Sequence, residues 1–303
     1  MFESILGNPA IKAFLHKSVI ENHLPAAFLF TGIEGIGKSL FAKDLALHLL
    51  QSDQQRINRE IHPDFHVIRP CGKSGLHSIE TVRQLIDDAH AAPFEAMAKV
   101  FVIHDAHRMQ SAAANALLKI LEEPSPDTLF ILITSAMQEI LPTIASRCRI
   151  LRFQALAVSE IATLLVERGL PGQFATLAQG SAGLALDLAA KIKLYESLFQ
   201  LLAERYSYTD LSLTLEKIAK EIEQEDPVKQ ASNVESLFSI ILMWHRDQIA
   251  RRLHVPLFFP EAPQASCPLV PLNEVERLID EARLAISRNM RLSVCLEQVL
   301  YNK

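Results

Sequence analysis

Cysteines are scarce and widely spaced in this sequence of 303 residues. The four cysteines, Cys71, Cys148, Cys267 and Cys295, form no C-x-x-C pair. Neither a zinc site made from neighbouring cysteines nor a disulfide framework is therefore indicated, and we expect four reduced thiols. The eleven histidines are also scattered, and we expect them at loops and strand ends before we expect them as metal ligands.

Long apolar runs and a basic amino terminus are missing as well. The longest apolar stretches, residues 128–133 and 237–244, are too short for a membrane-spanning helix or contain polar residues. The first four residues, M-F-E-S, lack the basic start of a signal peptide. We therefore expect a cytoplasmic protein with no membrane partner.

Positive charge is in deficit, because 30 lysines and arginines face 35 acidic residues and the formal net charge is -5. This balance argues against a surface that binds nucleic acid throughout, although a local basic patch stays possible. Any contact with DNA would be local or shared with partners. A hydrophobic fraction of 49% over this length allows two or three domains with cores of their own.

One complete motif organises the chain. Residues 32–39 read G-I-E-G-I-G-K-S and match G-x-x-x-x-G-K-[ST] in full. The short apolar run at residues 27–30 indicates a strand before the motif, and residues 40–50 have the leucine spacing of a helix after it. In this context glycine N–H groups can surround a polyphosphate, and the helix N-terminus adds partial positive charge.

The motif predicts a site for ATP or ADP with Mg²⁺. The residues expected to bind nucleotide are Gly32, Gly35, Ile36, Gly37, Lys38, Ser39 and Leu40. Lys38 is predicted to reach the β- and γ-phosphates, and Ser39 to bind Mg²⁺. The alternative is a glycine-rich turn that carries a surface lysine.

Strands and helices alternate through the first half of the chain. The predicted strands cover residues 27–30, 65–68, 99–103 and 129–133. The predicted helices cover residues 5–21, 40–50, 78–86 and 112–121, with Ser78 as a cap, while residues 52–59 and 72–75 are predicted to be a loop and a turn. This alternation indicates an α/β fold, a mostly parallel sheet with helices on both faces and ligands at the carboxyl ends of its strands.

Beyond residue 153 only helical patterns remain. The predicted helices cover residues 159–168, 173–177, 184–200, 211–222, 227–253 and 272–300. We predict a P-loop nucleotide-binding core at residues 1–154, a small helical domain at 155–207 and an all-α domain at 208–303. The third segment carries an apolar stripe of Val234, Leu237, Phe238, Ile241 and Leu242, which fits either assembly with other subunits or an ordinary bundle core.

Two further stretches carry a resemblance to a known family. Residues 115–124 read N-A-L-L-K-I-L-E-E-P and residues 146–148 read S-R-C, and with the P-loop they resemble the clamp-loader branch of the AAA+ ATPases. The resemblance is most specific over residues 1–190, and N-M-R-L at residues 289–292 is similar to part of the family's last helix. It implies an AAA+ core, a helical lid and a C-terminal helical collar that joins subunits in a pentameric ring.

The chain departs from the family at the acidic position after the third strand. Active members carry two adjacent acids there, one for Mg²⁺ and one to activate water, whereas residues 104–107 read H-D-A-H. Counting back from Asn115 places Asp105 at the water-activating glutamate and His104 at the Mg²⁺ aspartate, and a shift of one residue reverses the two. In either case one function is missing, and phosphoryl transfer depends on positioned charge.

The lid motif and the zinc module depart as well. Residues 180–186 read G-S-A-G-L-A-L and are similar to the lid motif G-S-x-R-x-A-L, so that Gly183 takes the place of the arginine that faces the γ-phosphate. The family's four-cysteine zinc module is absent because no cysteine lies between Ser39 and Cys71, and we predict no zinc or other structural metal. The resemblance gives Thr134 and Ser135, at the end of the fourth strand, a sensor-1-like role.

The resemblance also places an arginine finger at Arg147, acting in trans on ATP held by the neighbouring subunit. An arginine there is always charged and offers a planar fork to phosphate oxygens. The alternative is that Arg147 only pairs with a local carboxylate.

These features predict a stationary clamp-loader subunit that binds nucleotide, hydrolyses it poorly and helps to load the sliding clamp at primed DNA. The implied partners are the other loader subunits in a hetero-pentameric ring, the sliding clamp, and primer-template DNA through the assembled complex of a DNA polymerase holoenzyme. Two alternatives remain: an active AAA+ ATPase, such as a motor subunit of the same assembly, and a nucleotide-binding scaffold unrelated to replication.

Overall fold

The computed structural model describes residues 1–71, 75–203, 208–224, 227–266 and 270–301. The chain divides into two compact units. The first unit comprises Met1–Glu167 and Leu177–Ala185, and the second comprises Arg168–Thr176 and Leu186–Lys303.

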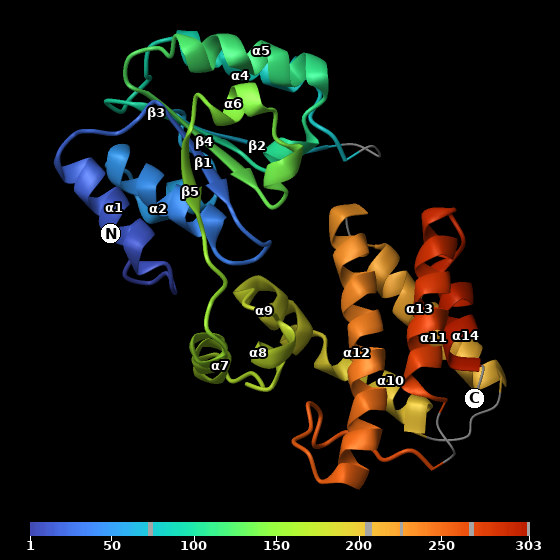
Figure 1. Cartoon of the computed structure of the whole chain (residues 1–303). Coiled ribbons are helices and arrows are strands. Elements are labelled where there is room, and N and C mark those ends of the chain that lie inside the picture. The colour runs from blue at the N-terminus through green and yellow to red at the C-terminus, as the bar shows by residue number, and fades with distance from the viewer. Residues whose placement is uncertain (72–74, 204–207, 225–226, 267–269, 302–303) are drawn as a thin grey trace. The chain divides into compact units, whose positions relative to one another are not determined.

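The first unit is built on a five-stranded parallel sheet with the strand order β2-β3-β4-β1-β5 (Figure 1). Its strands are β1 (Ala27–Thr31), β2 (Phe65–Ile68), β3 (Lys99–Ile103), β4 (Thr128–Thr134) and β5 (Arg149–Arg152). The first four confirm the predicted strands, and the parallel α/β fold is confirmed with them. The prediction missed β5 because this edge strand begins and ends with exposed arginines, so its apolar run is short.

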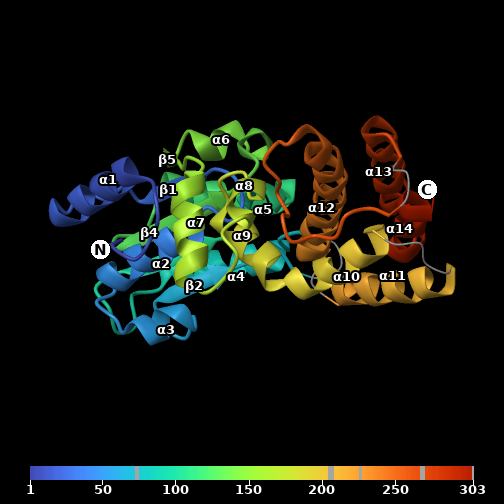
Figure 2. The ribbon, with the colours of Figure 1, turned by 90° about the horizontal axis from the view of Figure 1, so that it is seen from below.

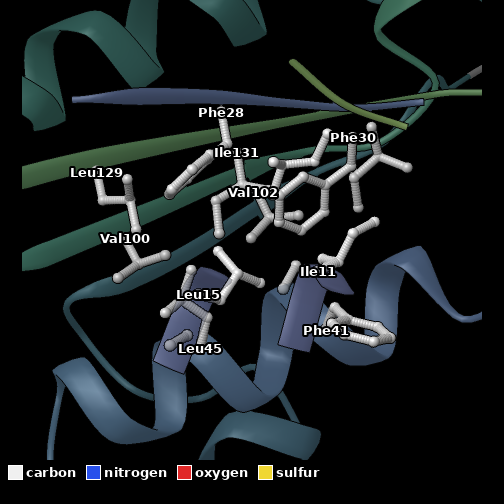
Figure 3. Close-up of a cluster of buried hydrophobic side chains, with 14 of the residues drawn as sticks. Ile11, Leu15, Phe28, Phe30, Phe41, Leu45, Val100, Val102, Leu129 and Ile131 are labelled. Atoms are coloured by element: carbon white, nitrogen blue, oxygen red, sulfur yellow. The ribbon is translucent and has the colours of Figure 1, made fainter. Parts of the chain in front are cut away.

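Helices cover both faces of this sheet (Figure 1 and Figure 2). The helices of one face are α1 (Pro9–Ile20), α2 (Lys38–Leu49) and α3 (Gln54–Asn58), and those of the other are α4 (Ile79–His90), α5 (Ser111–Glu122) and α6 (Pro142–Ala145). Alternate residues of β1 serve the two faces: Phe28 and Phe30 join the core with α1 and α2 (Figure 3), whereas Leu29 joins the core with α4 and α5. The three central strands, β1, β3 and β4, are buried on both sides, as is usual in a parallel sheet covered by helices.

Two smaller predictions for this unit need comment. Residues 52–59, predicted to be a loop, contain α3, because the side chain of Asp53 accepts a hydrogen bond from the N–H of Gln55 (3.1 Å) and caps a short helix. Most of the turn predicted at residues 72–75 lies outside the described residues. The remaining helical elements are η1 (Ala106–Arg108), η2 (Met137–Glu139) and α7 (Val158–Glu167).

The rest of the chain is helical. It contains α8 (Phe174–Leu177), α9 (Ala182–Ala190), α10 (Ile192–Ala203), α11 (Tyr208–Glu223), α12 (Pro227–Leu253), α13 (Leu272–Ser287) and α14 (Leu292–Tyr301). The single helix predicted at residues 272–300 is two helices, with a break at which Asn289 adopts a left-handed φ of 64°. In Figures 1 and 2, α11 lies beside α14 although they are far apart in the sequence.

The apolar stripe of α12 faces the core of its own unit. Leu237, Phe238 and Ile241 are at most 1% exposed, and Val234 and Leu242 are partly buried. An ordinary bundle core therefore accounts for the three buried residues of this stripe, and the part of the stripe in assembly remains a prediction. No helix of the described residues is both long and apolar enough to cross a membrane.

Part of the predicted lid domain packs with the second unit. The ring of Phe259 lies 6.1 Å from that of Phe174 and 4.8 Å from that of Phe199, and the hydroxyl of Ser266 donates to the carbonyl of Ala203 (2.7 Å). The structure thus shows two compact units, whereas three domains were predicted. A separate lid and collar remain predictions, and the boundary predicted at residue 207 lies outside the described residues.

Candidate nucleotide-binding site

The predicted P-loop connects β1 to α2 at the carboxyl end of the sheet. The turn after Thr31 needs backbone conformations that favour glycine, since Gly35 and Gly37 have φ values of 74° and 100°. Helix α2 then begins at Lys38, and its first N–H groups have no carbonyl partners within the helix. The strand, loop and helix therefore form the anion-binding arrangement that the motif predicts.

Lys38 is held inside this loop. Its ammonium group donates to the carbonyl of Gly32 (2.6 Å) and to that of Ile33 (2.7 Å), and the residue is only 6% exposed. Burial lowers the pKa of Lys38 from 10.5 to about 8, although the negative charges of Glu34 and Asp105 act in the opposite direction. The alternative of a turn with a surface lysine is therefore wrong, and the ammonium group is preorganised within the cradle.

The two apolar residues of the predicted site have different environments. Ile36 is 1% exposed, and its Cδ1 lies 2.6 Å from the place that a Cβ on Gly32 would occupy. Gly32 is required at that close approach, and the side chain of Ile36 supports the loop from within the core. Leu40 is 56% exposed, so its side chain lies at the surface of the first turn of α2.

Gly183, which takes the place of the lid arginine, lies where the lid segment contacts the P-loop backbone. The N–H of Gly183 donates to the carbonyl of Gly35 (2.9 Å), and a Cβ on Gly183 would lie 2.9 Å from the Cα of Gly35. A Cβ on Gly35 would lie 2.2 Å from the hydroxyl oxygen of Ser181, which accepts from the N–H of Leu184 (3.1 Å). Both glycines are therefore needed for this contact, and it has no room for an arginine at residue 183.

One carboxylate and one neutral imidazole follow β3. Burial, helped by the positive charge of Arg69, lowers the pKa of His104 to about 4, so this ring is uncharged near neutral pH. Asp105 has a left-handed φ of 46°, and its negative charge acts to raise the pKa of Lys38. The structure therefore provides a single negative charge where active members of the family have two.

The sensor-1-like residues differ from each other. Thr134 is fully buried, its hydroxyl lies 3.1 Å from Nδ1 of His107, and it accepts from the N–H of Ala136 (3.1 Å). Ser135 is exposed. The prediction missed the role of His107. The H-D-A-H stretch contains this residue, but no local pattern reveals its hydrogen bond to Thr134 at the end of the neighbouring strand.

A second missed feature is the segment that precedes α1. The N–H of Phe2 donates to Oδ2 of Asp44 (2.7 Å), and its ring stacks on that of Phe41 with centroids 5.1 Å apart. The side chain of Ile5 would contact a Cβ on Gly37 at 3.7 Å. The amino-terminal residues therefore pack along α2 and border the P-loop, an arrangement that needs long-range contacts and has no local sequence signal.

Arg147 follows α6 and contacts α5 and α6. Its guanidinium donates to the carbonyl of Thr143 (2.9 Å) and to the carboxylate of Glu122. The isolated chain thus shows the pairing with a local carboxylate that was the alternative for this residue. Action on a neighbouring subunit remains a prediction, and the structure does not bring Arg147 into the P-loop of its own chain.

The oxygen donors present suit a magnesium nucleotide. The hydroxyl of Ser39, at the start of α2, and the carboxylate of Asp105 are the kinds of ligand that Mg²⁺ prefers, and Mg²⁺ usually takes only one or two carboxylates besides phosphate oxygens. Within the described ranges no group of three or more His, Cys, Asp or Glu residues could hold a metal ion. The absence of zinc remains a prediction.

The cysteine of the S-R-C stretch is not reactive. Burial raises the pKa of Cys148 to about 12, so this thiol is inert.

The fold and the site together define a P-loop protein of the AAA+ class: a parallel sheet ordered β2-β3-β4-β1-β5 with a phosphate-binding loop between β1 and α2. Residues 7–157 match the family model described as DNA polymerase III, delta subunit. The first half of the chain carries a domain of this family, and the chain is a clamp-loader-related AAA+ protein.

Individual relatives agree with this assignment. The chain is 34% identical over 184 residues to the DNA polymerase III subunit delta′ of Bacillus subtilis, covering 56% of this chain and 54% of the relative. It is 29% identical over 235 residues to the subunit gamma/tau of Mycoplasma genitalium, covering 70% and 38%. The matches thus span about half or less of these relatives.

A solved structure supports the fold alone. The DNA polymerase III gamma subunit-related protein of Thermotoga maritima has a TM-score of 0.54 at 18% identity, covering 96% of this chain and 97% of that one.

Proposed function

We propose that this chain is a stationary δ′-like subunit of the DNA polymerase III clamp loader, which assists ATP-dependent loading of the sliding clamp onto primed DNA. Its partners in this role are the other loader subunits of a hetero-pentameric ring, the sliding clamp, and primer-template DNA through the assembled complex. The relationship to δ′ and γ/τ subunits supports the choice of assembly.

The observation that carries the proposal is the combination of a formed phosphate cradle with an incomplete set of charges. Lys38 is buried and bonded within the loop, whereas the end of β3 offers only Asp105 beside the neutral His104. The lid adds no cation, because Gly183 lies against the backbone of Gly35. Nucleotide binding needs the cradle, and hydrolysis needs the missing charges.

Each residue of the site has a part in binding. The backbone N–H groups of Gly35 to Ser39 surround the phosphates, Lys38 neutralises them, and Ser39 and Asp105 would hold Mg²⁺. The ion, when bound, shields the charge of the phosphates. Thr134, whose hydroxyl is hydrogen-bonded to His107, acts as the sensor-1-like residue of the site. With one carboxylate, the chain can either hold Mg²⁺ or orient water but cannot do both, so bound nucleotide stays intact.

The contribution of the chain to hydrolysis is made in trans. Arg147 lies in the S-R-C stretch, is partly exposed, and presents a guanidinium that is always charged. Supplied to the nucleotide of a neighbour, it would stabilise the charge of the transition state, which is worth roughly 10³–10⁵ in rate for arginine fingers.

The proposal is tested by measuring nucleotide binding and steady-state turnover of the purified chain. ATP or ADP should bind with negligible hydrolysis, and Lys38→Ala should abolish binding while the fold, followed by circular dichroism, is retained. Robust hydrolysis by the unaltered chain would contradict the stationary role and favour an active motor subunit. Failure to copurify with other loader subunits of the same organism would contradict the choice of assembly.

A further inference from the structure

The third residue of the P-loop is a glutamate. Residues 32–35 read G-I-E-G, so Glu34 lies within the loop that surrounds the phosphates. Its side chain is exposed, and within the part of the chain that the structure describes it forms no ion pair and no hydrogen bond. No bonded cation therefore neutralises this carboxylate, although the loop that carries it is built to bind a polyanion.

The backbone on both sides of Glu34 is held in place. The preceding carbonyl, that of Ile33, accepts a hydrogen bond from the ammonium group of Lys38 (2.7 Å). The following carbonyl, that of Gly35, accepts one from the N–H of Gly183 (2.9 Å). The position of Glu34 in the loop is therefore fixed, and moving it away from a bound phosphate would break one of these contacts.

The charge of Glu34 reaches the ammonium group of the cradle. The carboxylates of Glu34 and Asp105 both act to raise the pKa of Lys38, and Glu34 acts more strongly. The hydrogen bonds of the ammonium group run to the carbonyls of Gly32 and Ile33 and leave both carboxylates unbonded to it. The negative charge of Glu34 thus lies close to the cation of the cradle and acts on any phosphate that this cation binds.

The terminal phosphate of a triphosphate is the group that this charge affects most. In P-loops the backbone N–H groups surround the α- and β-phosphates, and the lysine reaches the β- and γ-phosphates. The ammonium group of Lys38 is bonded to the carbonyl directly before Glu34, so a phosphate that contacts the ammonium group comes close to residue 34. ADP lacks the third phosphate, and the repulsion from Glu34 therefore falls mainly on ATP.

The other charges around the cradle do not compensate for Glu34. Asp105 is a second carboxylate, and the ring of His104 beside it is neutral near neutral pH. The lid segment places Gly183, which has no charge, against the P-loop backbone. The ammonium group of Lys38 thus faces two carboxylates, and an unpaired charge of the same sign as the ligand selects against the more highly charged ligand.

We propose that Glu34 is a specificity-determining residue that weakens the binding of a nucleoside triphosphate relative to a diphosphate, so that this chain binds ADP more tightly than ATP. The inference rests on the nucleotide binding of the proposed function and adds the identity of the preferred nucleotide. Glu34 acts through repulsion of the terminal phosphate and forms no bond to the ligand. A bound diphosphate has no γ-phosphate to cleave, which agrees with a stationary role.

The test measures the equilibrium binding of ADP and of ATP to the full chain, by isothermal titration calorimetry in the presence of Mg²⁺. The unaltered chain should bind ADP more tightly. Glu34→Gln keeps the size of the side chain and removes its charge, so it should improve the affinity for ATP by about threefold to tenfold and that for ADP by less. Glu34→Asp keeps the charge and should retain the preference for ADP.

The matched control is Glu123→Gln, at an exposed glutamate between α5 and β4. This residue precedes the amino end of β4, whereas the P-loop lies at the carboxyl end of the sheet. The substitution removes the same charge far from the cradle and should leave both affinities unchanged.

Ionic strength separates a charge effect from a structural one. The difference in ATP affinity between the unaltered chain and Glu34→Gln should shrink when NaCl is raised from about 0.05 M to about 0.5 M, because salt screens an exposed charge. A difference that is independent of salt would overturn the role assigned to the charge.

Three other outcomes would overturn the proposal. If the unaltered chain binds ATP as tightly as ADP or more tightly, or if Glu34→Gln leaves the ratio of the two affinities unchanged, the proposal fails while nucleotide binding stands. If Glu34→Asp shifts the ratio as much as Glu34→Gln does, the charge is not the cause. If the unaltered chain binds neither nucleotide, the proposal and the nucleotide binding of the proposed function fail together, whereas steady-state hydrolysis by the unaltered chain contradicts the stationary role alone.

Discussion

Arg147 donates a hydrogen bond to the carboxylate of Glu122 and so joins the S-R-C stretch to the end of α5. The arginine also donates to the carbonyl of Thr143 (2.9 Å). Its side chain is 33% exposed and that of Glu122 is 50% exposed, so solvent screens the pair. Arg147, which we propose acts on the nucleotide of a neighbouring subunit, is thus oriented by hydrogen bonds within its own chain and stays partly exposed.

The strength of this pair separates the two accounts of Arg147. If the guanidinium is available to a phosphate, Glu122→Ala should lower the free energy of unfolding by less than about 1 kcal/mol, as for other exposed ion pairs. Urea denaturation measures the change, with Glu123→Ala as the control at the neighbouring exposed acid. A loss above about 2 kcal/mol in the free energy of unfolding would show that the pair behaves as a desolvated ion pair, and Arg147 would then be a structural residue.

Restoring the lid arginine should not restore hydrolysis. Gly183→Arg places a side chain 2.9 Å from the Cα of Gly35, so the lid segment must move away from the P-loop. We expect a loss of about 1–3 kcal/mol in the free energy of unfolding, the usual cost of overpacking, and no gain in turnover.

The control for this substitution is Ala182→Arg, which adds the same side chain at the neighbouring, partly exposed residue. It should be tolerated better. Thermal unfolding and steady-state ATPase assays report both effects, and an active, undestabilised Gly183→Arg protein would show that the Gly35 contact is not what excludes the arginine.

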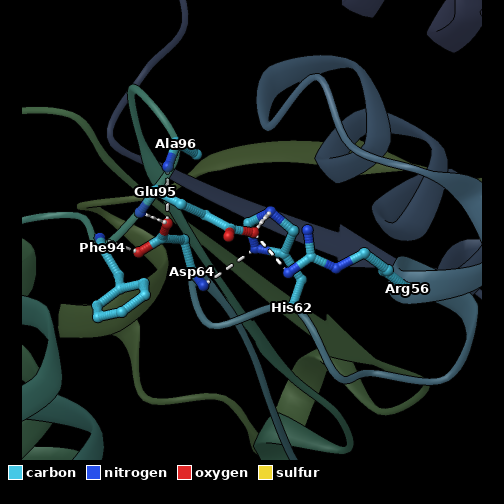
Figure 4. Close-up of polar contacts among 6 residues, drawn as sticks. All are labelled: Arg56, His62, Asp64, Phe94, Glu95 and Ala96. Atoms are coloured by element: carbon cyan, nitrogen blue, oxygen red, sulfur yellow. Dashed lines mark hydrogen bonds and ion pairs between the residues drawn. The ribbon is translucent and has the colours of Figure 1, made fainter.

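Acid should loosen the loop between α4 and β3, residues 91–98, because buried Asp64 accepts hydrogen bonds from three of its N–H groups (Figure 4). Burial acts to raise the pKa of Asp64, but the hydrogen bonds from Phe94, Glu95 and Ala96 outweigh it, and the pKa lies below its usual 3.8. A carboxyl with a lowered folded-state pKa adds stability above its unfolded-state pKa and loses that contribution as the pH falls through the folded-state value.

The unaltered protein should therefore lose more stability than Asp64→Asn as the pH falls from about 5 through the lowered folded-state pKa of Asp64. Denaturant unfolding at a series of pH values makes the comparison, with Asp87→Asn, an exposed acid of α4, as the control. Parallel pH profiles for the unaltered and Asp64→Asn proteins would contradict the assignment.

The sequence predicted the parts of the fold that follow from local pattern. Continuous apolar runs gave four strands, and the complete P-loop motif located the site, because both depend on residues close together in the chain. The edge strand β5 escaped prediction because Arg149 and Arg152 interrupt its pattern. The stripe around Phe238 did not reveal its partner, since period alone cannot say whether an apolar face meets its own bundle or another subunit.

The remaining features depend on contacts between distant residues. Three contacts join segments that no periodicity relates: the approach of Gly183 to Gly35, the bond between Thr134 and His107, and the hydrogen bonds of Asp64 to the loop between α4 and β3. The resemblance to a family gave the position of Gly183 in the lid motif. Only the structure shows that a glycine is needed there.

The most direct test of the stationary role is the ATPase rate of the reassembled clamp loader, stimulated by clamp and primed DNA, with Arg147→Ala in this chain. Arg152→Ala, at an exposed arginine of β5, is the matched control. We predict that Arg147→Ala lowers turnover by about 10³-fold at the neighbouring site, with unchanged assembly and unchanged nucleotide binding to this chain. Full turnover in an intact complex that contains Arg147→Ala would contradict the assignment.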